Sequence, residues 1–88
     1  MEVNKKWYLY VVECADGTLY TGITTNVNRR LKEHNHSGKA AKYTRSRRPV
    51  KLLMTKEYTT HSEALTEEWR FKKMNRKQKL EVINGRKD

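Results

Sequence analysis

Apolar and polar positions alternate along the chain in a way that first predicts a β-hairpin. Aromatic and β-branched residues fill both faces of Trp7–Cys14, which is typical of a central strand. Asp16 and Gly17 form a tight-turn signal, and Leu19–Ile23 is the expected return strand of an antiparallel pair. Gly22 interrupts that second strand, so we predict either a bulge or a close approach of backbone or ligand there.

The pattern then changes to helical spacing, returns to a strand, and becomes helical again. Apolar positions four residues apart predict a helix over Val27–Asn35, and Val50–Tyr58 reads as a third strand. Thr60 and Glu63 have the spacing of a capping box, which predicts a second helix running to about Asn75. A residue such as Asn75 can also cap the helix that follows.

The last predicted element is a short helix over Arg76–Ile83 that ends at Gly85. The order strand, strand, helix, strand, helix, helix predicts an α+β fold, with a small three-stranded antiparallel sheet flanked by helices. A chain of 88 residues is expected to form one domain, spanning 1–88 with a core at about 7–84.

A basic segment, Ser37–Arg48, joins the first predicted helix to the third strand. At this length such a connection is either functional or mobile. The whole chain has 20 Lys and Arg against 10 Asp and Glu, a net charge of +10 that attracts polyanions such as DNA, RNA or an anionic membrane. Charge alone does not separate these partners, and an ordinary solvated charged loop is the alternative. The side chains expected to contact nucleic acid are Arg29, Lys39, Lys42, Arg45, Arg47 and Arg48.

The chain shows no pattern of a membrane or secreted protein. Its apolar run Trp7–Val12 is too short to span a bilayer, and no signal peptide is visible. Cys14 stands alone, so it has no partner for an internal disulfide and no zinc-site spacing, and we expect it to pack as a small apolar residue. The expected location is the cytoplasm, with no membrane partner; protein partners are left open.

An acidic residue stands out on the second long helix. Helical-wheel arithmetic places Glu68 about 25° from the centre of the apolar face. That face is defined by Ala64, Leu65, Trp69, Phe71 and Met74. A carboxylate aimed at a core is costly unless it is paired, hydrogen-bonded or bound to a cation. Glu68 is therefore either a metal ligand or a flanking residue that reaches solvent or pairs with an arginine.

Four further side chains are candidates for chemistry. Tyr10 and Tyr20 fall close to opposite each other on the predicted hairpin, so their phenols are expected on one face, although aromatic pairs at such positions commonly serve packing. Arg30 and His34 lie one helical turn apart and together can hold a phosphate. A solvated face is the alternative for the pair, and His34 can also be a general base or a satisfied core residue.

The order of these residues resembles the GIY-YIG nuclease family, particularly its small stand-alone bacterial members. The two motif strands correspond to Tyr8–Tyr10 and Tyr20–Gly22. The family's Arg, ten residues beyond the second Tyr, corresponds to Arg30, with His34 four residues later and Glu68 on the downstream helix. The resemblance extends over about residues 7–74. It departs at Tyr8, Thr21 and Ile23, where the family has Gly, Ile and, in some members, Lys.

This resemblance implies a metal-dependent endonuclease that hydrolyses phosphodiester bonds, with DNA favoured over RNA. The implied catalytic residues are Tyr10, Tyr20, Arg30, His34 and Glu68. Glu68 would hold a single Mg²⁺ or Mn²⁺, both of which prefer oxygen ligands. Two alternatives remain open: a non-enzymatic nucleic-acid-binding module that keeps the nuclease scaffold, and a basic RNA- or ribosome-associated protein.

Overall fold

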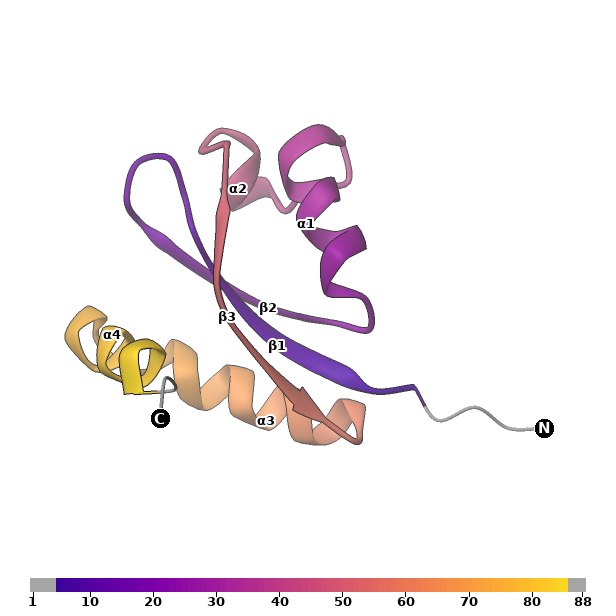
Figure 1. Cartoon of the computed structure of the whole chain (residues 1–88), viewed down its shortest axis with the longest axis vertical. Helices are drawn as coiled ribbons and strands as arrows, with labels where there is room; N and C mark the ends of the chain where they lie inside the picture. The colour runs from indigo at the N-terminus through magenta and orange to yellow at the C-terminus, as the bar shows by residue number, and fades with distance from the viewer. Residues whose placement is uncertain (1–4, 86–88) are drawn as a thin grey trace.

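A computed structural model describes residues 5–85 and shows an α+β fold (Figure 1). The predicted order of elements is confirmed, with one short helix, α2, added inside the basic segment. The elements are β1 (Trp7–Glu13), β2 (Leu19–Thr24), α1 (Val27–His36), α2 (Lys42–Arg45), β3 (Lys51–Tyr58), α3 (His61–Lys72) and α4 (Arg76–Gly85).

The sheet is antiparallel with the strand order β2-β1-β3, so the strand predicted to be central is central. Between β1 and β2 the register is continuous and places Tyr10 opposite Gly22 and Val12 opposite Tyr20. An irregularity in the ladder lies instead between β1 and β3, next to Val11. The β1–β2 turn is tight because Gly17 adopts a φ of 85°, a conformation that suits glycine.

Successive residues of β1 point to opposite faces of the sheet, and each face has its own core. One core packs beneath α3 and α4 and consists of Leu9, Val11, Met54 and Phe71. The other faces α1 and α2 and consists of Tyr10, Val12, Cys14 and Val50. Figure 1 shows the two helix pairs on opposite sides of the sheet. The expected apolar packing of Cys14 is confirmed.

The helix starts that the sequence predicted are capped as expected. The side chain of Thr60 accepts a hydrogen bond from the backbone N–H of Glu63, at 3.1 Å. Asn75 and Gln78 form a reciprocal box at the start of α4, because the side chain of each accepts from the backbone N–H of the other, at 2.8 and 3.0 Å. The Thr60 cap fixes where α3 begins, and the Asn75–Gln78 box separates α3 from α4.

The predicted apolar face of α3 is wrong in part. Leu65 and Trp69 are 44% and 61% exposed, whereas Ala64 and Phe71 are buried. The helix packs through Ala64 and Phe71, and at about 100° per residue Leu65 and Trp69 turn away from the line between them. The Lys73 ammonium lies 4.0 Å from the centre of the Trp69 ring and covers part of it. The correction moves the packed line towards Glu68.

No helix within residues 5–85 is both long enough and apolar enough to cross a membrane.

Candidate functional site

The site begins with a close contact between the two strands of the hairpin. A Cβ atom added at Gly22 would lie 2.6 Å from the Tyr10 hydroxyl oxygen and 2.8 Å from the ring carbon that carries it. The phenol of Tyr10 therefore occupies the space that a side chain at position 22 would need. The close approach predicted at Gly22 is confirmed, and a side chain makes it. The alternative of a bulge in β2 against β1 is wrong, because the register is continuous.

Behind Tyr10 lies a chain of buried polar groups. The Tyr10 hydroxyl is 2.7 Å from Nε2 of His34, and Nδ1 of His34 is 2.7 Å from the Thr44 hydroxyl. His34 and Thr44 are both 0% exposed. Burial, aided by the positive charge of Arg30, lowers the pKa of His34 to about 4, so its imidazole is neutral near pH 7. Both ring nitrogens are engaged, which is the geometry of a satisfied core histidine.

Three other candidate residues gather around Tyr10. Burial raises the pKa of Tyr10 to about 12; hydrogen bonding with Arg30 opposes that rise, and the charges of Tyr20 and Glu68 add to it. The rings of Tyr10 and Tyr20 lie 6.5 Å apart between centres, which places both phenols on one face as predicted. Tyr20 also meets the edge of the His34 ring, at 5.4 Å between centres.

Arg30 is held at the rim of this cluster. Its Nη1 atom donates to a Glu33 carboxylate oxygen at 2.8 Å and to the Lys39 carbonyl at 2.9 Å, and its side chain is 23% exposed. The hydrogen bond from Arg30 lowers the pKa of Glu33, so that partner stays ionised. Arg29 approaches the same carboxylate at 3.6 Å. The guanidinium of Arg30 is thus fixed in place while part of it faces solvent.

Glu68 turns towards the sheet, as the helical wheel predicted. Its side chain is only 18% exposed, and one carboxylate oxygen lies 3.1 Å from the ammonium of Lys72. Glu68 thus has an ion-pair partner, but it is a lysine and not the arginine that the sequence analysis considered. Within the described residues 5–85, no three or more His, Cys, Asp or Glu side chains form a group able to hold a metal. One carboxylate still fits Mg²⁺, which commonly keeps several waters and binds through one or two carboxylates plus substrate phosphate.

The basic segment is fastened to the hairpin beside the site. Arg47 forms an ion pair with Asp16 at 3.0 Å, and its guanidinium lies 4.0 Å from the centre of the Tyr43 ring. Tyr43 in turn stacks on Tyr20, with 5.9 Å between ring centres and 24° between planes. Arg47, Tyr43 and Tyr20 form a continuous stack that joins α2 to β2.

The remaining basic candidates divide into anchored and exposed side chains. Arg48 donates to the carbonyls of His34, at 2.6 Å, and Ser37, and so secures the end of α1. Arg45 donates to the Gly38 carbonyl at 3.1 Å. Lys39 and Lys42 are exposed. Contact with nucleic acid stays a prediction for all of these side chains, including Arg29 and Arg47.

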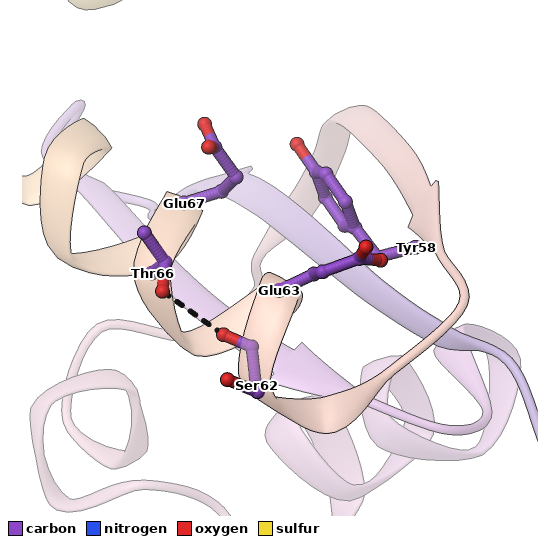
Figure 2. Close-up of a pocket in the computed structure, with 5 residues that line it drawn as sticks. All are labelled: Tyr58, Ser62, Glu63, Thr66 and Glu67. Carbon is purple, nitrogen blue, oxygen red and sulfur yellow. Dashed lines mark hydrogen bonds between the residues drawn. The ribbon is translucent and has the colours of Figure 1, made fainter.

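A hollow of about 370 Å³ lies away from this cluster, between the end of β3 and α3 (Figure 2). Its lining consists of Tyr58, Ser62, Glu63, Thr66 and Glu67. Glu63 hydrogen-bonds to Thr59, and Glu67 pairs with Arg70 at 3.3 Å. Two carboxylates make this hollow unfavourable for a polyanion. The basic rim around Arg30 is better suited to a phosphate backbone.

Two residues of the cluster were not selected from the sequence as site residues. Thr44 contacts His34 and is buried, yet a threonine within a basic run carries no signal of that contact. Glu33 follows Arg30 by three residues on α1 and holds its guanidinium. Side chains three residues apart lie on the same side of a helix, and this spacing could have identified Glu33. The five predicted catalytic residues otherwise occupy one region: hydrogen bonds and ring contacts join the four from the hairpin and α1, and the charge of Glu68 reaches Tyr10.

Comparison with known proteins identifies the family of this chain. The profile of the GIY-YIG catalytic domain matches residues 6–81, which is most of the chain. The chain therefore belongs to the GIY-YIG family, a nuclease family. Within it, this chain is similar to the group of bacterial proteins called UPF0213.

Two relatives of that group show the extent of the similarity. A UPF0213 protein of Streptococcus agalactiae is 53% identical over 81 residues, which cover 92% of this chain and 91% of the relative. A UPF0213 protein of Desulfotalea psychrophila is 51% identical over 79 residues, or 90% of this chain and 72% of the relative.

Solved structures show the same fold. The solution structure of a UPF0213 protein from Bacillus halodurans matches with a TM-score of 0.59 at 43% identity, covering 90% of this chain and 83% of that one. The solution structure of a protein from E. faecalis matches with a TM-score of 0.65 at 40% identity, covering 100% and 94%. The predicted GIY-YIG-like α+β fold is confirmed.

Proposed function

We propose that this protein is a metal-dependent endonuclease that hydrolyses phosphodiester bonds in nucleic acid, with DNA favoured over RNA. The observation that carries the proposal is the gathering of Tyr20, Arg30 and the Tyr10–His34 pair on one face, within electrostatic reach of Glu68. Packing alone requires neither a partly exposed guanidinium nor a largely buried carboxylate beside two phenols.

Arg30 would bind the scissile phosphate and stabilise its transition state. A guanidinium has five N–H donors in a fixed fork, which suits phosphate oxygens. Glu33, the Lys39 carbonyl and Tyr10 restrain Arg30, and its side chain remains partly exposed. A donor fixed in advance stabilises developing charge without reorganising during the reaction.

Tyr20 would contact the attacking water, either as a general base or by orienting it. A free phenol has a pKa of about 10, so nearby positive charge is needed to make it an effective base. Tyr10 has a different role in this proposal, because its phenol is buried and already paired with His34. Tyr10 and His34 would hold Arg30 and Tyr20 in their relative positions.

Glu68 would hold one divalent cation, Mg²⁺ or Mn²⁺, at the edge of the cluster. Such a cation, when bound, supplies positive charge next to the phosphate oxygens. The ammonium of Lys72, 3.1 Å from the carboxylate, would have to move aside or bind phosphate itself. The exposed basic side chains of 29–48 would contact the phosphate backbone, which gives affinity with little sequence specificity.

The Glu68–Lys72 ion pair also favours a second candidate function. A carboxylate that is permanently neutralised by a lysine would not recruit a cation. The protein would then be a non-enzymatic nucleic-acid-binding module on the nuclease scaffold. Its binding would depend on salt and would not depend on divalent metal.

The deciding experiment is a plasmid-nicking assay with Mg²⁺, with Mn²⁺ and with EDTA, alongside a salt titration of DNA and RNA binding. The endonuclease proposal expects nicked circles with a divalent cation and none with EDTA. Binding of equal strength in both conditions, without nicking in either, would support the binding module instead. Faster cleavage of an RNA of matched length would reverse the preference for DNA.

A further inference from the structure

Three buried hydroxyl and imidazole groups in the α1–α2 face form one hydrogen-bonded line. It runs from Tyr10 through His34 to Thr44 and ends at the Ala41 carbonyl, with distances of 2.7, 2.7 and 3.1 Å. Thr44 has no surface exposed to solvent, and it belongs to α2 rather than to any motif strand. The Thr44 end of the line is therefore buried, and no solvent-exposed group there can supply a missing donor or acceptor.

The hydrogens and acceptors of these groups allow two directions for this line. In one direction, the Thr44 hydroxyl donates to the Ala41 carbonyl, which also accepts from the backbone N–H groups of Thr44 and Arg45, and the Thr44 oxygen accepts the N–H of His34 Nδ1. A neutral imidazole has a single N–H, and Nε2 is then an acceptor for the Tyr10 hydroxyl. The oxygen lone pairs of Tyr10 are left for Arg30, which can only donate.

The opposite direction would leave a buried donor without a partner. If Thr44 donated to Nδ1, then Nε2–H would donate to Tyr10, and the hydroxyl hydrogen of Tyr10 would need another acceptor. The other polar group that acts on Tyr10 is the Arg30 guanidinium, which offers no acceptor, and Tyr10 is 3% exposed. Buried polar groups are nearly always hydrogen-bonded, so the first direction is favoured.

We propose that Thr44 is a positioning residue that holds His34 in its Nδ1–H tautomer and thereby turns the Tyr10 hydroxyl towards His34 and its oxygen towards Arg30. This inference rests on the proposed function for its consequence, which is that Tyr10 holds Arg30 and remains a proton donor. Tyr20 is then the phenol of the pair that can meet the attacking water. The sequence near Tyr10 and Tyr20 does not make that distinction.

The tautomer can be measured directly in the full chain by ¹⁵N NMR of the histidine side chains, since protonated and unprotonated ring nitrogens differ widely in chemical shift. A His34→Gln variant assigns the His34 signals against those of His36 and His61. We expect His34 near pH 7 to be neutral and protonated at Nδ1. A signal protonated at Nε2 would overturn the proposal, whether or not the protein nicks DNA.

Two variants of Thr44 test the role of its hydroxyl. Thr44→Val removes the acceptor while keeping the shape, so an Nε2–H population should appear and nicking should fall by roughly 5- to 100-fold, the equivalent of one unpaired buried donor. Thr44→Ser restores the hydroxyl and should restore both the Nδ1–H tautomer and the nicking rate. Thr66→Val is the matched control, because the Thr66 hydroxyl bonds to Ser62 on the exposed side of α3.

The outcomes separate this inference from the proposed function. An unchanged tautomer in Thr44→Val would contradict the positioning role even if nicking fell. If wild-type protein shows the Nδ1–H tautomer but never nicks with any divalent cation, the positioning role stands and the endonuclease proposal fails. If Thr44→Val does not fold, the wild-type tautomer and the Thr44→Ser spectrum still decide the matter.

Discussion

The two faces of the sheet bury their residues in different ways. Beneath α3 and α4, Leu9, Val11, Met54 and Phe71 form an apolar cluster, and the buried Thr21 lies opposite Val11 in the sheet. On the α1 and α2 face, Val12 and Val50 pack beside polar groups, and fully buried His34 and Thr44 lie among them. Every described buried polar side-chain atom has a hydrogen-bond partner. The cost of burying these polar groups is therefore offset, and they specify one geometry.

This difference indicates that the two faces of a very small domain contribute to different properties. Apolar packing on the α3 face supplies stability through area removed from water. The α1 face gives up part of that gain to hold Tyr10, His34 and Thr44 in fixed orientations. Glu68 links the two faces, because it extends from α3 while its charge reaches Tyr10 on the opposite side. Changes to the two faces should therefore affect different measurements.

The largest expected effect comes from opening the apolar face. Phe71→Ala should lower the free energy of unfolding by about 3–5 kcal/mol, since a buried aromatic ring leaves a cavity. Urea unfolding followed by circular dichroism measures this change. Trp69→Ala is the control, and its 61% exposed ring should cost about 1 kcal/mol or less. Equal losses for the two variants would contradict the packing of α3 described above.

The next effect tests the candidate site without disturbing the apolar core. Glu68→Gln and Arg30→Ala should each lower the nicking rate by about 10²- to 10³-fold, the typical loss when one preorganised electrostatic group is removed. Single-turnover nicking at saturating protein is the measurement, with thermal melting to confirm folding. Glu67→Gln is the matched control on the same helix, because Glu67 lines the other hollow and pairs with Arg70. Full activity in either variant would remove that residue from the proposed mechanism.

A smaller effect should appear in the pH dependence of stability. The pKa of His34 is lowered from 6.5 to about 4 in the folded protein, so the unfolded chain binds a proton between these values and the native state does not. Stability should therefore rise with pH across that window and be lost as pH falls through it. Urea midpoints between about pH 4.5 and 6.5 measure the slope.

Two variants assign that slope to one imidazole. His34→Gln should flatten it, whereas His36→Gln, at an exposed position, should leave it as in wild type. Asp16 and Glu33 have lowered pKa values, because hydrogen bonds from Thr18 and from Arg30 favour their charged forms. Their contributions are lost as pH falls from their ordinary pKa values of 3.8 and 4.5, at or below the lower end of this window. A slope that persists in His34→Gln would mean that another group titrates there.

The smallest expected effect concerns the exposed lysines of the basic segment. Lys39→Ala and Lys42→Ala should each reduce the salt dependence of DNA binding by about one unit in the slope of log K against log salt concentration. Fluorescence anisotropy with a labelled duplex measures that slope. Lys56→Ala on β3 provides a comparison outside this segment. If Lys56→Ala lowered the slope as much as Lys39→Ala does, the effect would come from net charge and not from the position of the lysine.

The fold could be predicted in large part from local signals. The Asp16–Gly17 turn, the box of Thr60 and Glu63 and the cap of Asn75 are short-range features, and each appears at its expected place. The predicted apolar face of α3 was wrong at Trp69. A helical wheel treats every large apolar residue as buried, whereas this ring lies at the surface with Lys73 over it.

The candidate site was predictable where its spacing is helical or cross-strand. Tyr10, Tyr20 and His34 come together because residues on paired strands, and on the helix that follows, have fixed offsets. Thr44 was not predictable, since its contact with His34 crosses a connection whose path no local rule gives. The short helix α2 was not predicted for the same reason. Its position depends on contacts of Arg47 with Asp16 on the hairpin and with the ring of Tyr43.

The contact of Tyr10 with Gly22 has a consequence for how the sequence can vary. The two positions share one volume, since the hydroxyl of one lies 2.6 Å from where the other would place its first side-chain carbon. A library randomised at both positions and selected for folding should return sizes that are inversely related, with any side chain at 22 accompanied by a smaller one at 10. Members selected for nicking should return almost only the tyrosine–glycine combination. Positions 10 and 22 would then vary together and not independently.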